Sequence, residues 1–462
     1  MAGPSDIKPI NEPRAFELSE LFFSTTDRKG VIRYGNETFT RIAGYTLSEM
    51  VGRPHNLVRH PDMPRAAFRL VWDDLSQGKT VAAYVKNLAR DGRYYWVLAL
   101  IMPTDAGYLS IRLKPSSKVF AHVKDVYARA LDAEKAAAGS GANSRAVMDA
   151  GAASITDSLG SLGFTTYDGF MSSALTAELT SRAEQLGPTG NAGAQLKADG
   201  EADPQRRRLL ALFEGAHRLD RELGGVIADP STFAHLRDRV IPKSDYFLKM
   251  GRLIRLQSVN AEVQAARLGE AGRALAMVSE RLSSNAGDGA QAVGQLNGKL
   301  RQLTDPIARL VFDAMVCKVQ VEMAATFVRD IIEGRHDASE DGRLAENLQL
   351  LFGQFLGRVR GIPQALDDLQ TELATIDREV RELGQFTRTM HFIYLTGKIE
   401  TARHDQAQSF AAIFEEIRRM IEQADKVLAE LLDSVGTNQK QIKRLGRIDA
   451  SAFEQLDQLL AA

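Results

Sequence analysis

The feature that most constrains the fold is a long stretch of helical periodicity in the C-terminal half of the chain. From Arg206 onward, apolar residues recur at spacings of three and four, and helix-breaking residues are few. This pattern is typical of long helices that pack along an apolar seam. The sequence therefore predicts an all-α region over residues 206–462. Its buried seams are expected to include three sets of residues: Leu256, Val259, Val263, Ala266; Phe392, Leu395, Ile399, Ala402; and Phe410, Ile413, Ile417, Met420.

An internal repeat accompanies this periodicity. The stretch "NAEVQAARLGEAGRALAMVSERL" begins at Asn260, and "TGKIETARHDQAQSFAAIFEEIR" begins at Thr396. Both contain an Ala-Arg pair before a polar turn, and the two arginines lie 403 − 267 = 136 residues apart. Two helical hairpins, at about residues 244–283 and 386–433, would build a four-helix bundle. The alternative to a duplication is that any two amphipathic helices resemble each other. A coiled coil is the other architecture that this periodicity allows.

The N-terminal region has a different character. Residues 18–115, after a tail of residues 1–17, contain two β-rich runs ("LFFSTTD", "GVIRYGN"), short helical stretches, and three further strands ending at "GYLSIRLKP". This order predicts one small mixed α/β domain. Residues 116–205 include Ala-, Gly- and Ser-rich stretches, which indicate a mobile linker with a possible helix in "FTTYDGFMSSALTAELTSRAEQL".

Composition narrows the classes of function. The chain has 462 residues and a formal net charge of −1, which gives no general attraction to nucleic acid. Its single cysteine, Cys317, excludes an internal disulfide and fits a reducing compartment. No apolar run is long enough to span a bilayer, and the N-terminus has no secretory signal. We therefore expect a cytoplasmic protein without membrane insertion.

One loop carries unusual chemistry. The stretch "HNLVRHPDMP", residues 55–64, holds two histidines, an arginine and an aspartate beside two prolines. Prolines disfavour a helix interior or a central strand, so a shaped loop is expected.

Together with "STTD", "GNETF", "AGYTLSEMVGRPHNLVRHPDMPRAAF", "VKN" and "YYWV", this loop resembles the PAS domain of aerotaxis receptors. The resemblance implies an α+β fold, with a five-stranded antiparallel sheet and short helices. It also implies a non-covalently bound FAD.

Six residues are candidates for holding this cofactor. Arg59 offers a planar fork of donors to phosphate, Asp62 can accept from ribose, and His60 titrates near neutrality. Trp72 and Trp96 offer flat surfaces for a ring, and Asn87 offers an amide that can present either a donor or an acceptor. Each also has an ordinary structural interpretation, as a loop ion pair, a capping or core residue, or a turn.

The sequence departs from this family in one wall of the expected site. Val81 stands where the family has a tryptophan, and Tyr84 could substitute for it. The membrane anchor of aerotaxis receptors is also absent.

The repeat stretch at 259–282 resembles the signalling tip of methyl-accepting chemotaxis proteins. The resemblance implies a helical hairpin that contacts a chemotaxis-type histidine kinase and its adaptor. Gln264 stands where that family has Glu, and the second copy departs further. The alternative is a helical dimer stalk without kinase contact. The residues carried over to the tip are Asn260, Gln264, Arg267, Glu270 and Arg273.

These observations predict a non-enzymatic signalling protein. A PAS domain with FAD would sense redox or oxygen state and act, as a homodimer, through a chemoreceptor-like helical module on kinase, adaptor or other signalling partners. The alternative is a PAS and helical scaffold without a cofactor. A flavoenzyme is a third class, but no Gly-rich dinucleotide loop or nucleophile with a base is present.

Overall fold

The structure, a computed structural model, describes residues 7–187, 204–227, 241–335, 341–403, 408–445, 455–456 and 458–459. The chain divides into two compact units. The first unit comprises residues 1–228, 312–361 and 449–462, and the second comprises residues 229–311 and 362–448. The expected all-α region 206–462 is thus shared between both units.

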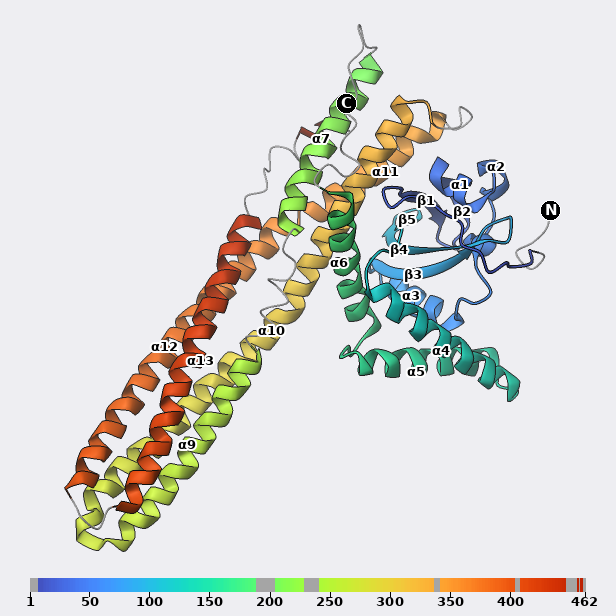
Figure 1. Cartoon of the computed structure of the whole chain (residues 1–462). Helices are drawn as coiled ribbons and strands as arrows, with labels where there is room; N and C mark the ends of the chain where they lie inside the picture. Colours follow the sequence, from blue (N-terminus) through green and yellow to red (C-terminus); the bar gives the residue numbers. More distant parts are fainter. Residues whose placement is uncertain are drawn as a thin grey trace. The chain divides into compact units, whose positions relative to one another are not determined.

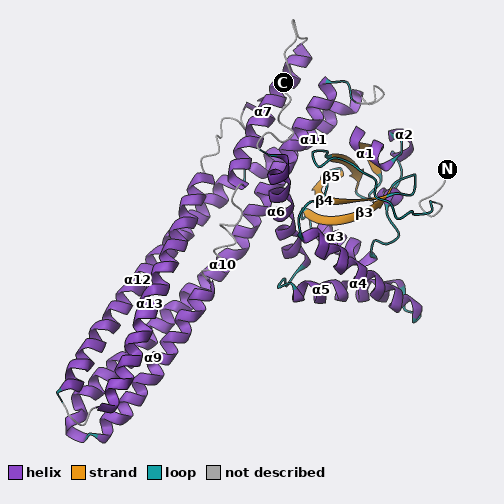
Figure 2. Cartoon of the chain, viewed as in Figure 1, coloured by secondary structure: helices purple, strands orange, loops and turns teal. Residues whose placement is uncertain are grey.

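A five-stranded antiparallel sheet organises the N-terminal domain, as the sequence predicts (Figure 2). Its strand order is β2-β1-β5-β4-β3. Side chains alternate between the two faces of each strand, so β3 to β5 supply one face to a cavity and the other to helices. The strands are β1 (Phe22–Asp27), β2 (Ile32–Gly35), β3 (Val81–Leu88), β4 (Tyr94–Thr104) and β5 (Gly107–Leu113).

Four short helices lie between β2 and β3. Asn36 begins the first of them, because its side chain accepts from the backbone N–H of Phe39 and also from that of Phe23 on β1. Thr46 and Glu49 form a capping box on the second. The helices are α1 (Glu37–Ala43), α2 (Leu47–Met50), the 3₁₀ turn η1 (His55–Val58) and α3 (Arg65–Ser76).

The expectation of a mobile linker over residues 116–205 is wrong for residues 119–186. Three helices stand there: α4 (Val119–Gly139), α5 (Ser144–Ser161) and α6 (Tyr167–Leu186). Alanine is the best helix former, and small residues let helices approach closely, so this composition builds packed helices. The possible helix in the "FTTYDGF" stretch is α6. Residues 188–203 lie outside the described residues.

Gly151 of α5 shows how closely these helices pack. A Cβ at this position would lie 2.6 Å from Glu134 Oε1 on α4 and 2.9 Å from the Cβ of Ala66 on α3. We expect Gly151→Ala to destabilise the first unit by about 1–3 kcal/mol through overpacking. The matched control is Gly160→Ala on the same helix, where the new Cβ meets nothing within 4 Å. It should stabilise by up to about 1 kcal/mol, because alanine is the better helix former. Urea denaturation would measure the free energy of unfolding of both variants. Equal changes in Gly151→Ala and Gly160→Ala would contradict the close packing at Gly151.

The first unit also contains α7 (Pro204–Ile227), α11 (Asp341–Val359) and residues 312–332 of α10 (Arg273–Ile332). Phe327 of α10 packs against Phe23 and Tyr34, with ring centroids 5.5 and 5.9 Å apart. The face of the sheet that carries Phe23 is therefore covered by helix rather than by solvent.

The second unit is a packed set of helices that run alongside one another (Figure 1). It comprises α9 (Ile241–Arg267), the 3₁₀ turn η4 (Gly269–Gly272), residues 273–311 of α10, α12 (Ile362–Ala402) and α13 (Gln408–Leu445). All four long helices contribute to one core, which includes Ile254, Ala261, Leu275, Met390 and Phe414.

Two of the three predicted apolar seams are wrong. Leu256 is 58% exposed and Phe392 is 70% exposed, and Val259, Val263, Leu395 and Ile399 are exposed as well. The core is reached instead through the neighbouring helix faces that carry small residues such as Ala261 and Ala265 of α9. The third set lies on α13, where Phe410, Ile417 and Met420 are buried and Ile413 is partly buried.

Candidate functional site

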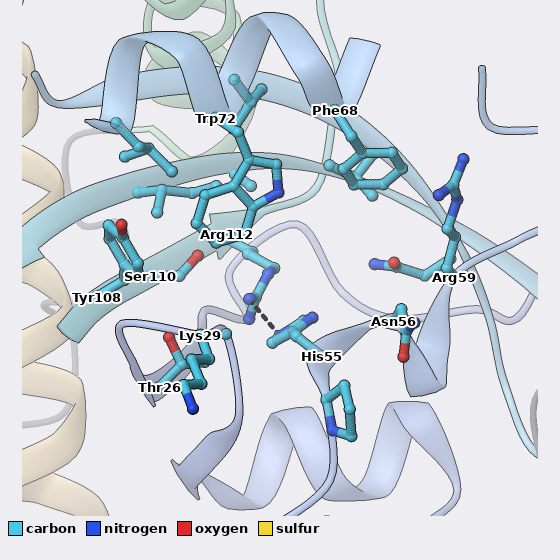
Figure 3. A pocket seen from close by; sticks show the side chains of 18 residues that line it. Thr26, Lys29, His55, Asn56, Arg59, Phe68, Trp72, Tyr108, Ser110 and Arg112 are labelled. Atoms are coloured by element: carbon cyan, nitrogen blue, oxygen red, sulfur yellow. Dashed lines mark hydrogen bonds between the residues drawn. The ribbon is translucent and has the colours of Figure 1, made fainter. Parts of the chain in front are cut away.

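A cavity of about 340 Å³ lies in the N-terminal domain, between α3, the sheet and the "HNLVRH" loop (Figure 3). Helix α3 provides an apolar and aromatic wall, and β3 to β5 provide the floor. The rim comes from the turn between β1 and β2 and from η1. The lining residues are Thr26, Lys29, Gly30, Pro54, His55, Asn56, Arg59, Phe68, Val71, Trp72, Leu75, Val85, Asn87, Ala99, Ile101, Tyr108, Ser110 and Arg112.

Arg112 brings a buried positive charge to this cavity. Its guanidinium donates to Ser24 Oγ at 3.1 Å and to His55 Nε2 at 2.7 Å. No carboxylate forms an ion pair with it among the residues that the structure describes. Burial lowers the pKa of Arg112 to about 10, so it stays charged at neutral pH. A buried cation without a counter-ion is costly, and an anionic or oxygen-rich ligand would offset that cost.

Ser110 adds an unsatisfied polar group beside Arg112. Its Oγ is buried and has no hydrogen-bond partner within the described parts of the chain. Buried hydroxyls in folded proteins are normally paired, so an orphan that lines a cavity points to a missing ligand or water. Together, Ser110 and Arg112 give the cavity one polar end, opposite the apolar wall of α3.

His55 completes the polar end as a neutral ring. Arginine can only donate, so Nε2 of His55 accepts the hydrogen bond from Arg112. The ring stacks on Phe39 at 5.5 Å. Desolvation, and next the charge of Arg112, lower the pKa of His55 to about 3.

This lowered pKa predicts acid sensitivity. An unfolded histidine has a pKa of about 6.5, so the unfolded chain gains a proton below that pH while folded His55 does not. Stability is therefore lost as pH falls from about 6.5 toward 3, by about 2 kcal/mol at pH 5. In His55→Gln this share of the loss should be absent. Urea denaturation at pH 6.5 and 5 would measure it, with exposed His122→Gln as control. Parallel pH profiles for wild type and His55→Gln would contradict it.

Three of the six predicted cofactor residues line the cavity. Arg59 donates to the carbonyl of Met63 at 3.0 Å and lies over the ring of Phe68, 4.5 Å from its centroid. Trp72 contacts Tyr108 edge-on, with centroids 5.3 Å apart, and is 42% exposed at the cavity mouth. Asn87 is buried on β3, where its backbone bridges to Arg59.

His60 and Asp62 do not line the cavity. The buried His60 ring accepts at Nδ1 from the backbone N–H of Asp62, at 3.1 Å, and stands edge-on to Tyr94. Burial, and next the charge of Lys86, lower the pKa of His60 to about 4. The Lys86 ammonium donates a hydrogen bond to the carboxylate of Asp62 at 2.8 Å. Both residues shape the loop that presents Arg59.

Trp96 and Tyr84 lie on the opposite face of the sheet. Trp96 packs against Phe120 and Tyr127 of α4, with centroids 5.3 and 6.3 Å away. The hydroxyl of Tyr84 donates to Glu178 of α6 at 2.7 Å. Neither side chain lines the cavity, so Tyr84 does not replace the aromatic wall missing at Val81. The alternation of β3 and β4 decides this, because odd-numbered residues such as Asn87 and Ala99 face the cavity.

Sequence reasoning missed Arg112, Ser110 and His55. His55 stands inside the loop motif, but its pairing with Arg112 joins positions 57 residues apart. The available signal was the alternation of "GYLSIRL", which places Tyr108, Ser110 and Arg112 on one face of β5.

The residues predicted for a signalling tip surround η4 in the second unit. Asn260, Arg267, Glu270 and Arg273 are exposed, and Glu270 pairs with Arg273. Gln264 is half-buried, and its Oε1 has no hydrogen-bond partner among the described residues. These residues form an exposed polar turn, and their contact with a partner stays a prediction.

Two further searches cover only the described residues. They contain no cluster of three or more His, Cys, Asp or Glu side chains placed to hold a metal ion. None of their helices is both long and apolar enough to cross a membrane.

Comparison with known proteins identifies the N-terminal domain. Residues 32–107 match the family described as the PAS fold. The aerotaxis receptor of Escherichia coli (strain K12) is 42% identical over 128 residues, which are 27% of this chain and 25% of the receptor. A nitrogen fixation regulatory protein of Klebsiella pneumoniae is 31% identical over 87 residues, 19% of this chain and 18% of that protein. The match thus spans a quarter or less of these relatives' own length.

Solved structures that resemble this chain include one described as "Flavin Analogue Sheds Light on Light-Oxygen-Voltage Domain Mechanism". It is 25% identical and covers 23% of this chain and 84% of its own, with a TM-score of 0.20. A Rhodobacter sphaeroides LOV protein is 16% identical and covers 31% of this chain and 86% of its own, with a TM-score of 0.19. The chain therefore carries a PAS-fold domain that is similar to part of the aerotaxis receptor.

Proposed function

We propose that the PAS cavity binds the ring system of FAD and that the chain is a redox- or oxygen-responsive signalling protein. The observation that carries this proposal is the buried Arg112 guanidinium, which faces the cavity without a carboxylate partner among the described residues. Similarity to the aerotaxis receptor supports a sensing role.

The residues present fit a flavin. The cavity, at about 340 Å³, is at the small end of the range for ligand sites, so it suits the ring while the dinucleotide tail would extend outside. Arg112 and Ser110 offer donors to the oxygen- and nitrogen-bearing edge of such a ring. Trp72 and Phe68 offer apolar contact to its faces. Arg59 is a rim donor suited to a phosphate group.

A bound flavin would supply a reversible change in protonation and hydrogen bonding with its redox state. The protein's part would be to orient the ring and to respond. Asn87 can rotate its amide and present either its oxygen or its NH₂ to the cavity. If the ligand's redox state favours one of these two amide orientations, it would change the packing of β3 and of the helices that cover β3.

The proposed output is contact with protein partners rather than an enzymatic step. The exposed turn around η4, with Arg267, Glu270 and Arg273, would contact a chemotaxis-type histidine kinase and its adaptor, or other signalling proteins. A homodimer is part of this proposal.

An absorbance spectrum of the purified full chain tests the cofactor directly. We expect oxidised-flavin bands and release of FAD on denaturation. Trp72→Phe, at the cavity mouth, should weaken FAD binding by up to about tenfold through lost aromatic contact. Trp96→Phe, on the opposite face, should leave binding unchanged. If no pigment is bound even after FAD is added, the cofactor proposal is wrong and a scaffold without cofactor is favoured.

A further inference from the structure

The helix that forms the cavity wall lacks a cap of its own. Helix α3 is preceded by Pro64, which makes no side-chain hydrogen bond to its first turn. The carboxylate of Glu134 on α4 takes that place instead. It accepts from the backbone N–H groups of Arg65 at 3.0 Å and Ala66 at 2.7 Å. Glu134 is buried, and a negative charge at a helix N-terminus is favoured by the helix dipole. The position of the wall is therefore fixed by α4.

A second buried carboxylate connects the start of α4 to α6. Glu178 of α6 accepts from the backbone N–H groups of Ser116 and Ser117, from Ser117 Oγ and from the hydroxyl of Tyr84. The Ser116 hydroxyl also donates to it, at 3.5 Å. Five donors therefore surround this fully buried group, four of them in the segment that leads into α4. Helix α6 cannot shift relative to α4 without leaving a buried charge unpaired, which is costly.

A third connection joins α6 to α10. Arg182, one turn after Glu178, donates from Nη1 to both carboxylate oxygens of Glu322 on α10, at 2.6 and 2.7 Å. It also donates to the backbone carbonyls of Leu18 and Ser19 before β1. Both members of the pair are buried, so breaking it alone is unfavourable.

We propose that these buried carboxylates, Glu134, Glu178 and Glu322, form a relay that couples occupancy of the cavity to the packing of α10. The relay runs from the α3 wall through α4 and α6 to α10, entirely within the first unit. It rests on the proposed function only in assigning a ligand to the cavity. Glu134 is thus a positioning residue for the wall that carries Phe68 and Trp72. A ligand in the cavity would displace this wall, and the relay would transmit that displacement of α3 to α10.

The chain contains its own probe of α10. Cys317 is its only cysteine, lies five residues before Glu322 (322 − 317 = 5) and is fully buried. The rate at which N-ethylmaleimide modifies Cys317 in the full chain therefore reports local opening of α10 packing. We expect bound FAD to slow this rate in wild type. In Glu134→Ala, the absorbance spectrum should show that FAD is still bound, but FAD should no longer slow the labelling of Cys317. Asp132→Ala, an exposed carboxylate on the same helix, should behave as wild type.

A ligand-free arm separates the relay from the cofactor. Without any ligand, Glu134→Ala should speed labelling of Cys317 by about 5–30-fold, as expected for loss of a helix cap that is coupled to α10. Ile42→Val, in the core on α1, controls for general destabilisation. At an equal loss of the free energy of unfolding in urea, it should change the labelling rate less. Glu134→Gln keeps one acceptor and should lie between.

Two results would overturn the relay. One is a labelling rate in Glu134→Ala within twofold of Asp132→Ala in the ligand-free chain. The other is a wild-type slowing by FAD that persists in flavin-loaded Glu134→Ala. If FAD fails to bind wild type, the proposed function fails, while the ligand-free comparison still decides the relay.

Discussion

Replacing Arg112 with Met is expected to stabilise the ligand-free PAS domain and to remove its flavin binding. Among the described residues, the buried guanidinium has two side-chain hydrogen-bond partners, Ser24 and His55, and it lies over the ring of Phe39. Its pKa is lowered to about 10 because burial disfavours the charge. An apolar side chain of similar length avoids that cost, so we expect a gain of about 1–2 kcal/mol in the free energy of unfolding. Loss of a charged donor should weaken flavin binding by at least tenfold.

The opposite signs of these effects make the prediction specific. A residue that only supports the fold would lose stability and ligand together. FAD titration followed by absorbance, and urea denaturation followed by tryptophan fluorescence, measure the two quantities. Both tryptophans, Trp72 and Trp96, lie in the PAS domain, so the fluorescence reports the first unit alone. Arg93→Met, at an exposed ion pair, is the matched control and should change neither by much. If Arg112→Met still binds FAD as wild type does, Arg112 is not the donor that holds the flavin at the polar end of the cavity.

Replacing Glu322 with Ala is expected to cause the largest loss of stability in the first unit. It leaves the buried guanidinium of Arg182 without its carboxylate partner, and removal of one member of a buried pair costs about 3–5 kcal/mol. The remaining bonds of Arg182 to the carbonyls of Leu18 and Ser19 are too few to compensate.

The double replacement Arg182→Leu with Glu322→Leu should recover most of that loss, because it removes both charges and leaves apolar packing. The same fluorescence-detected urea transition measures both variants. Glu333→Ala, at an exposed ion pair near the end of α10, is the control and should cost less than about 1 kcal/mol. If Glu322→Ala is as stable as this control, the Arg182–Glu322 pair does not determine the stability of the first unit.

The sequence predicted the PAS sheet well because its signals are local. Alternating strands and Gly-containing turns each depend on residues close in the chain, and all five strands appear where they were expected. The site was predicted in part for the same reason. Arg59, Trp72 and Asn87 reach the cavity, whereas Trp96 lies on the other face of β4 and packs against Phe120.

The sequence by itself determined the order of strands and short helices in residues 18–115, the loop that presents Arg59, and the helical character of residues 241–445 where they are described. Only the tertiary structure decided which helix faces are buried. On α9, Leu256 is exposed while the smaller Ala261 and Ala265 face the core, where closely packed helices favour small side chains. On α12, Phe392 is exposed while Met390, Ile393 and Tyr394 face the core. The tertiary structure also decided which charges are buried. Arg112 with His55, Glu134 with the start of α3, and Arg182 with Glu322 join residues 57 to 140 positions apart, and such pairings follow from the packing of distant elements rather than from local sequence.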